Sequence, residues 1–275
     1  MTTTSQSQPE TGNRFGSILQ AERRNWNRAS LQAGAVAAAI IASGIVVDLF
    51  DFERLFSGMS AIGVLMAEMV PPDFTNAGDW VKPVIDTLAM SVAGTALAVA
   101  LSIPLAFLAA ENTAPNKTVY RVARFLLNLL RSVPELIMGI VFVAAVGFGA
   151  LPGVLALGLH SVGMVGKFFA EAVEHAHVAP VEAARAAGAT PLQVITHGIL
   201  PQVLPQFADV AMYRWEYNFR ASTVMGMVGA GGIGLELMSS LRLMSYNEVF
   251  AILLVILALV SVVDALSSRL RRRFK

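Results

Sequence analysis

Long runs of apolar residues, each about as long as a membrane is thick, constrain this chain more than any other feature of its sequence. The runs cover residues 31–50, 84–110, 123–146, 151–172 and 249–266. A helix of about 20 residues crosses the roughly 30 Å hydrocarbon core of a bilayer. Of the 275 residues, 55% are hydrophobic and 14% are charged, whereas about a quarter of the residues in a soluble domain are charged. The sequence therefore predicts an all-α membrane protein.

The two ends of the chain are basic, which indicates an even number of membrane spans. The flanking basic residues are Arg14, Arg23, Arg24 and Arg28 before the first run, and Arg269, Arg271, Arg272, Arg273 and Lys275 after the last. Positively charged residues beside spans mark the cytoplasmic side, so both termini are expected there. Because five runs are an odd number, we expect a sixth span within residues 203–229, which are rich in glycine and carry charges.

The resulting expectation is one domain of six transmembrane helices in the inner (plasma) membrane. The spans cover residues 31–268, and a basic cytoplasmic tail, residues 269–275, follows them. Residues 1–30 are expected to form a cytoplasmic tail that is largely disordered, since residues 1–22 are rich in serine, threonine and glutamine. Residues 51–83 should form an acidic external connection.

A segment between the fourth apolar run and the span predicted within residues 203–229 carries the signals of two helices joined by a sharp turn. Pro180 suits the first turn of a helix, and Gly188 suits its end. Thr190 can then cap a second helix, with Pro191 at its first position and Gln193 completing a capping box. We call residues 180–201 the elbow and expect it in the cytoplasm.

The elbow resembles the EAA loop of ABC importer permeases. The residues that match are Glu182, Ala183, Ala184, Gly188, Leu200 and Pro201. This family has isoleucine where the chain has Gly198, so the match to the family pattern is looser over the second helix than over the first. The resemblance implies the type I (MetI-like) permease architecture and an elbow that docks on a separate ATPase. It also implies that ATP and Mg are bound by the ATPase subunits and that this chain holds no cofactor.

Longer strings resemble the permease of phosphonate ABC transporters over roughly residues 80–270. They are Arg131–Glu135, Leu155–Lys167, Tyr213–Ser222 and Gly229–Gly234. The resemblance implies a second permease copy, most simply in a homodimer, together with two ATPase subunits and an extracytoplasmic phosphonate-binding protein. The cargo it implies is phosphonate or a related oxyanion, phosphate or phosphite, and no nucleic acid is expected as a partner.

Charged residues inside the predicted spans are the candidates for a substrate pathway. They are Arg131, Lys167, Arg214, Glu216 and Arg220. Ionisable groups at that depth are costly and usually face a bundle interior or a water-filled cavity, and the planar guanidinium of arginine suits phosphoryl oxygens. A structural role is the alternative, because Glu216 with Arg220, and Lys167 with Glu171, have the spacing of ion pairs on one helix.

A second function class remains open, an ion-coupled secondary transporter of a small anion. In it Asp209, Glu216 or His160 would relay protons, although a packed, hydrogen-bonded role suits His160 better. This alternative predicts uptake without any ATPase, and it leaves the elbow without a purpose.

A cluster of glycines follows the predicted fifth span. Gly229, Gly231 and Gly234 match the dinucleotide pattern G-x-G-x-x-G, but no strand–helix–strand pattern surrounds them. With Gly232 they are instead expected to form a gate or turn near the external end of that span. The chain has no cysteine, no Walker A sequence and no cluster with metal-ligand spacing. We therefore expect a transport subunit and no enzymatic activity of its own.

Overall fold

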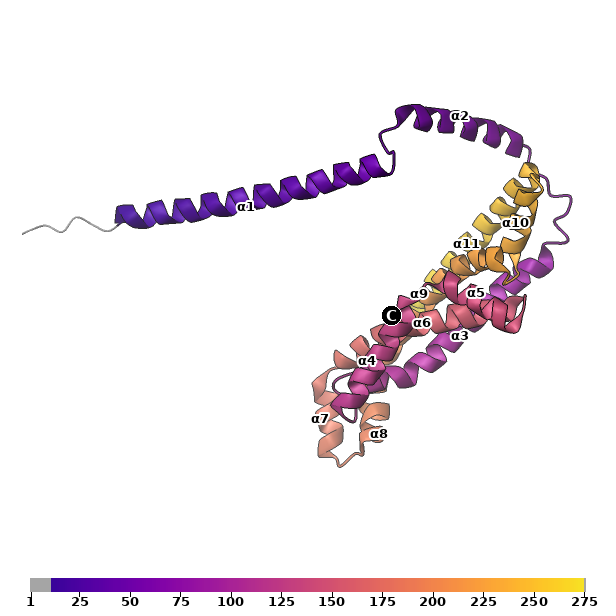
Figure 1. Ribbon diagram of the computed structural model, residues 1–275. Helices are drawn as coiled ribbons and strands as arrows, with labels where there is room; N and C mark the ends of the chain where they lie inside the picture. Colours follow the sequence, from indigo (N-terminus) through magenta and orange to yellow (C-terminus); the bar gives the residue numbers. More distant parts are fainter. Residues whose placement is uncertain (1–10, 275) are drawn as a thin grey trace, which may run out of the picture. The chain divides into compact units, whose positions relative to one another are not determined.

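A computed structural model describes residues 11–274 of the chain, and this range is helical without a strand (Figure 1). The chain divides into two compact units, one up to Leu65 and one from Met66 onward. Four helices are long and apolar enough to span a membrane singly, and two bent helix pairs each pass the same test together. If each pair counts as one span, the total is the six that the sequence predicts.

The first helix starts well before the first apolar run. Helix α1 covers Thr11–Val46, and its membrane-length part is Asn25–Val46. The prediction of a largely disordered tail over residues 1–30 is therefore wrong from Thr11 onward, because alanine, glutamine, glutamate and arginine before the apolar run favour helix and extend it backward. Residues 1–10 lie outside the described range. Helix α2, Phe52–Met69, lies in the segment that was expected only to connect.

The second unit is built around two long helices that pack along their length. They are α3, Val81–Ala109, and α6, Ala150–Glu174 (Figure 1). Helix α9, Leu200–Met225, packs against both, and α11, Tyr246–Phe274, packs against α9. Glycines allow the close approach. A Cβ atom at Gly158 would lie 2.7 Å from Leu97 of α3, so small residues at this interface bring the two helices together.

Two of the spans are broken. Helix α4, Lys117–Ser132, meets α5, Glu135–Val146, at an angle of 85°. Pro134 lies at the break, where its ring removes a backbone donor and disfavours helix at the preceding residue. The second break separates α9 from α10, Ile233–Arg242, by 45°. It confirms a sixth span near residues 203–229 but extends that span through a glycine turn.

The connection that enters α3 is tied to the start of α11. The side-chain amide of Asn247 donates to the carbonyl of Pro71 at 2.7 Å, and the backbone N–H of Asp73 donates to the carbonyl of Asn247 at 3.1 Å. The hydroxyl and backbone N–H of Thr75 donate to the Asp73 carboxylate and lower its pKa. Beside this connection Trp80 is buried next to α10 and α11.

Candidate coupling and translocation sites

The elbow forms the helix–turn–helix that its sequence signals indicate. Helix α7, Val178–Ala186, ends before Gly188, which has a φ of +80° that glycine adopts without strain. Helix α8, Pro191–Gln193, then begins with a capping box: the backbone N–H of Thr190 donates to the side chain of Gln193 at 2.8 Å, and the Thr190 hydroxyl accepts from the Gln193 backbone. A π-helical turn, Val194–Ile199, leads directly into α9.

The elbow has an exposed face of small side chains and a packed inner face. Glu182, Ala183, Gly188 and Pro201 are exposed, whereas Ala184 and Leu200 are half-buried. The exposed face is the surface that the resemblance assigns to contact with an ATPase.

The second arm of the elbow packs against the first. Gly198 is buried, and a Cβ atom there would lie 3.5 Å from the Cα atom of Val181 and 3.6 Å from the carbonyl oxygen of Pro180. The position at which the family pattern has isoleucine is therefore packed against the first arm at ordinary van der Waals distance.

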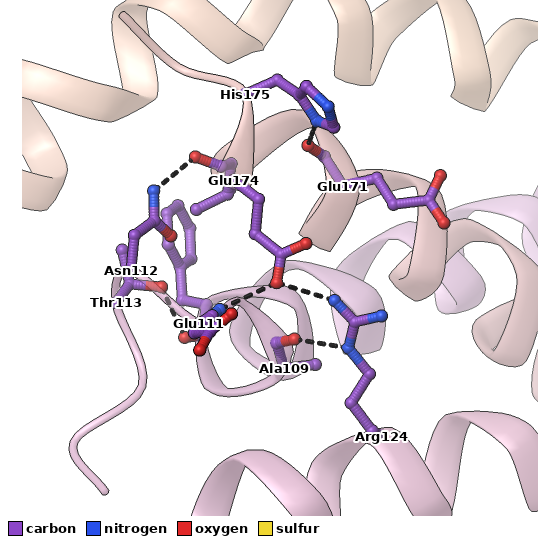
Figure 2. Close-up of polar contacts among 10 residues, drawn as sticks. Ala109, Glu111, Asn112, Thr113, Arg124, Glu171, Glu174 and His175 are labelled. Atoms are coloured by element: carbon purple, nitrogen blue, oxygen red, sulfur yellow. Dashed lines mark hydrogen bonds and ion pairs between the residues drawn. The ribbon is translucent and has the colours of Figure 1, made fainter. Parts of the chain in front are cut away.

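Beside the elbow, a polar junction joins the end of α6 to the α3–α4 connection (Figure 2). The Glu174 carboxylate accepts from the Arg124 guanidinium at 2.7 Å and from the Glu111 backbone N–H at 2.8 Å. Arg124 also donates to the carbonyl of Ala109 at 2.8 Å, and Asn112 donates to the carbonyl of Val173 at 2.8 Å. These contacts fix α3, α4 and α6 to one another at one end of the bundle.

A cavity of about 170 Å³ separates the junction from the elbow. Asn112 and Thr113 of the α3–α4 connection line one side, and the elbow residues Arg185, Pro191 and Ile195 are among those that line the other.

Arg214 is the most deeply buried of the predicted pathway residues. Its side chain is 1% exposed, and its Nε donates to the Ser161 hydroxyl at 2.7 Å. The guanidinium lies 4.1 Å from the ring centre of Tyr217, and Nη1 approaches the sulfur of Met164 at 3.2 Å. Its Nη2 is buried and has no hydrogen-bond partner among the described residues. Arg214 therefore contributes a positive charge inside the protomer that no carboxylate contacts directly within the described range.

The polar layer around Arg214 lies at mid-span. Ser161 donates to the side-chain oxygen of Asn218 at 3.0 Å, and the Asn218 amide donates to the Thr95 hydroxyl at 2.9 Å. Thr95 is the central residue of the 29-residue helix α3. Buried polar groups that are bonded to one another in this way fix three helices in register.

Glu216 and Arg220 pair with α11 and not with each other. Arg220 binds Asp264 at 2.9 Å, and Glu216 binds Arg271 at 2.7 Å. The alternative of a Glu216–Arg220 ion pair within one helix is therefore wrong, because carboxylate and guanidinium partners on α11 are closer. Arg220 is exposed on this chain and Glu216 is buried. The two residues, which their spacing places on one face of a helix, therefore have different surroundings.

The remaining two predicted pathway residues make no ion pair within the described part of the chain. Arg131 is exposed in the last turn of α4, and Lys167 is half-buried on α6. The proposed pairing of Lys167 with Glu171 is absent from the ion pairs of residues 11–274. A backbone contact explains where Arg131 sits, since a Cβ atom at Gly163 would lie 2.6 Å from its backbone nitrogen.

Sequence reasoning missed Glu135 as a member of the polar site. Glu135 begins α5 at the break, and its carboxylate accepts from the Tyr217 hydroxyl at 2.7 Å and lies 3.2 Å from His160 Nε2. His160 Nδ1 lies 3.0 Å from the carbonyl oxygen of Val133, which confirms the expectation of a packed, hydrogen-bonded histidine. The signal available in the sequence was a glutamate directly after a proline within an apolar run.

The glycine cluster forms a tight turn between α9 and α10. Gly229, Gly231 and Gly232 have φ values of +98°, +75° and +76°, which favour glycine. A Cβ atom at Gly234 would collide with the carbonyl of Thr223, and one at Gly232 would lie 2.5 Å from the Thr87 hydroxyl. That hydroxyl accepts from the backbone N–H of Ile233 at 2.9 Å. The predicted turn is present, and it is packed against α3.

Comparison with known proteins identifies the class to which this architecture belongs. Residues 102–275 match the family model described as binding-protein-dependent transport system inner membrane component, and the chain belongs to this family. Its fold is that of type I ABC importer permeases: the inward-facing MetNI methionine ABC transporter aligns with a TM-score of 0.63 and 22% identity, covering 71% of this chain and 96% of that one.

Two relatives share a higher sequence identity with the chain. The chain is 66% identical over 258 residues to the phosphite transport system permease protein PtxC of Stutzerimonas stutzeri, covering 94% of both chains. It is 41% identical over 234 residues to the phosphate-import permease protein PhnE of Mycolicibacterium smegmatis, covering 85% of this chain and 44% of the relative. The suspected kinship with permeases of the phosphonate, phosphite and phosphate group is thus confirmed.

Proposed function

We propose that this chain is the membrane-spanning subunit of an ATP-driven importer and that its cargo is a phosphorus oxyanion, with phosphite as the first candidate. The 66% identity to a phosphite transport permease over nearly the whole chain carries the proposal. The buried, unshared charge of Arg214 supports it, because an anion that crosses low-dielectric surroundings requires positive charge nearby. Phosphate and phosphonate share the same oxyanion head and are the alternative cargoes.

Two copies of the chain are needed to enclose the pathway, and a homodimer is the simplest arrangement. Arg220 and Asp264 are each about 45% exposed on one copy. Charged groups on a membrane span avoid lipid, so this face lies against a second copy or a water-filled path between copies. Arg220 and Arg131 are then positioned to meet the cargo, whereas Arg214 acts through its charge from within. Glu216 and Lys167 remain candidates that line the same path.

The elbow transmits the movement of two ATPase subunits, which bind ATP and Mg, from the cytoplasm. The exposed small residues Ala183 and Gly188 let a partner surface approach the backbone of the elbow. The junction around Glu174 carries the movement onward, because it joins three spans beside the elbow. With the elbow on that side, both termini lie in the cytoplasm and a cargo-binding protein acts on the opposite side of the inner membrane.

Reconstitution tests the proposal. The chain is inserted into liposomes with its ATPase and binding protein, and uptake of radiolabelled phosphite, phosphate and methylphosphonate is measured with and without internal ATP. We expect ATP-dependent uptake with phosphite preferred. Uptake of equal rate without ATP, driven by an ion gradient, would support the secondary transporter and contradict the proposal. Uptake of none of the three anions would contradict the cargo assignment.

A further inference from the structure

A surface pocket lies between α5 and α9, close to the break in the α4–α5 span. Its volume is about 240 Å³, and it is lined by Glu135, Leu136, Tyr217, Arg220, Ala221 and Val224. Three of these residues bring polar atoms, and the other three bring apolar walls. Since Asn218 of α9 contacts the central residue of α3, the neighbouring Tyr217 and the pocket lie near the middle of the spans.

The hydrogen bonds of His160 determine how many protons this site holds. Nδ1 of His160 faces the carbonyl oxygen of Val133 at 3.0 Å. A carbonyl only accepts, so Nδ1 carries a proton. Nε2 of the same ring lies 3.2 Å from the carboxylate of Glu135. That second contact needs a further proton, either on Nε2 or on the carboxylate, because otherwise two lone pairs face each other. The intact His160–Glu135 pair therefore carries no net charge, and it becomes negative when this proton leaves.

Of the other arginines near the pocket, two have no carboxylate partner in the described part of the chain. Arg220 is neutralised by Asp264 at 2.9 Å. Arg214 stands behind the ring of Tyr217 at 4.1 Å and has no carboxylate partner in the described part of the chain. Arg131 ends α4 on the far side of the break and pairs with no carboxylate among residues 11–274. Of these two arginines, Arg214 is the one that lies against a residue of the pocket wall, Tyr217, so the pair of His160 and Glu135 decides whether the charge of Arg214 is offset there.

We propose that this pocket holds the phosphorus oxyanion in transit, and that the shared proton of His160 and Glu135 sets its affinity for the anion. The inference rests on the proposed function and adds the site and its proton dependence. With the proton in place, the charge of Arg214 is uncompensated and the pocket attracts an anion. Without the proton, the carboxylate of Glu135 offsets Arg214 and faces the anion directly. Transport must therefore decrease as the pH rises.

Two substitutions, of which Glu135→Gln keeps the shape of the side chain, separate this idea from a structural role. Glu135→Gln leaves an amide that can donate to neutral His160 and accept from Tyr217, so the pocket stays net positive at every pH. His160→Gln leaves Glu135 as a carboxylate with an amide donor, so the offsetting charge is always present. Asp86→Asn makes the same carboxylate-to-amide change outside the pocket, at a half-buried residue paired with Lys82, and serves as the control.

The assay is ATP-driven uptake of radiolabelled phosphite by the reconstituted complex from about pH 5 to about pH 8, the interval in which histidine ordinarily titrates. The uptake rate of each variant is divided by that of wild type at the same pH, so that the effect of pH on the protonation of the cargo cancels. We expect the ratio for Glu135→Gln to rise about tenfold across the interval, the size of one nearby charge. The ratio for His160→Gln should begin low and increase toward one, and that for Asp86→Asn should stay constant.

The inference is overturned if the uptake ratio of Glu135→Gln to wild type stays constant with pH while the variant melts and assembles with the ATPase as wild type does. That result would leave the proposed function intact. If Glu135→Gln does not fold, a constant ratio for folded His160→Gln overturns it in the same way. Failure of wild type to take up any phosphorus oxyanion at any pH overturns the proposed function and this inference together.

Discussion

Replacing the buried Arg214 by methionine should abolish transport without lowering the stability of the protein. Arg214→Met loses a charge-assisted hydrogen bond to Ser161, worth about 1.5–3 kcal/mol, and the contact with the ring of Tyr217, worth about 2 kcal/mol when desolvated. The variant also removes a buried nitrogen without a partner, which costs about 1–3 kcal/mol. In addition it removes the desolvation penalty of a buried ion, which is several kcal/mol.

The losses and gains in stability nearly cancel, and removal of the buried ion tips the balance toward methionine. Ser161 keeps its bond to Asn218 at 3.0 Å in the variant, so it is not left unsatisfied. We expect stability to stay the same or to rise by about 1–2 kcal/mol, as is observed when buried ions give way to apolar side chains of similar volume. For a domain of about 200 residues, 1 kcal/mol shifts Tm by about 2–4 °C.

Two measurements on one preparation test this prediction. Thermal unfolding in detergent, followed by tryptophan fluorescence, should give a Tm equal to or above that of wild type, and phosphite uptake should fall at least tenfold. Arg124→Met is the matched control, because it leaves the Glu174 carboxylate without its partner at 2.7 Å and should lower Tm. A lower Tm for Arg214→Met together with normal uptake would show that Arg214 is a structural residue, and would refute the reasoning.

Three further substitutions test the elbow, the helix packing and the ties to α11. Gly188→Val places a branched side chain at a φ of +80°, so ATP hydrolysis should continue while uptake is lost; normal uptake would contradict the coupling role. Gly163→Leu must displace the backbone of Arg131, 2.6 Å from the new Cβ atom, and should destabilise the protein by about 1–3 kcal/mol or more, seen as a Tm below that of wild type; an unchanged Tm would show that α4 yields easily. Glu216→Gln and Arg271→Gln should each lower Tm, and the double variant should lose less than the sum of the two single losses; a double-mutant cycle without coupling would show that their ion pair contributes nothing.

The sequence predicts the fold class and the elbow well because both depend on local patterns. Apolar runs of membrane length identify spans one at a time, and a capping box such as that of Thr190 and Gln193 involves residues only three positions apart. The glycine turn was predictable for the same reason, since its positive φ values are a property of individual residues.

The polar site was predicted less well because its partners come from different helices. Spacing along α9 suggested Glu216 with Arg220, yet each binds a residue of α11 that is 44 to 55 positions away in the sequence. The spacing of residues along one helix gives no information about partners on another helix. The role of Glu135 was missed because it depends on an 85° bend that brings the start of α5 to His160 and Tyr217. A proline indicates that a helix breaks but not in which direction the chain continues.

The glycines on α6 have a mechanical consequence. At Gly163 the backbone of α4 touches the backbone of α6, and at Gly158 a leucine of α3 rests where a side chain would otherwise stand. These contacts are close, because no side chain of α6 stands between the helices at these two points. At residue 163 the distance between α4 and α6 is therefore set by the two backbones, and at residue 158 the distance between α3 and α6 is set by Leu97 against a bare backbone. Any larger residue at position 163 would have to move the whole of α4 away from α6, whereas one at position 158 would first displace a single leucine side chain.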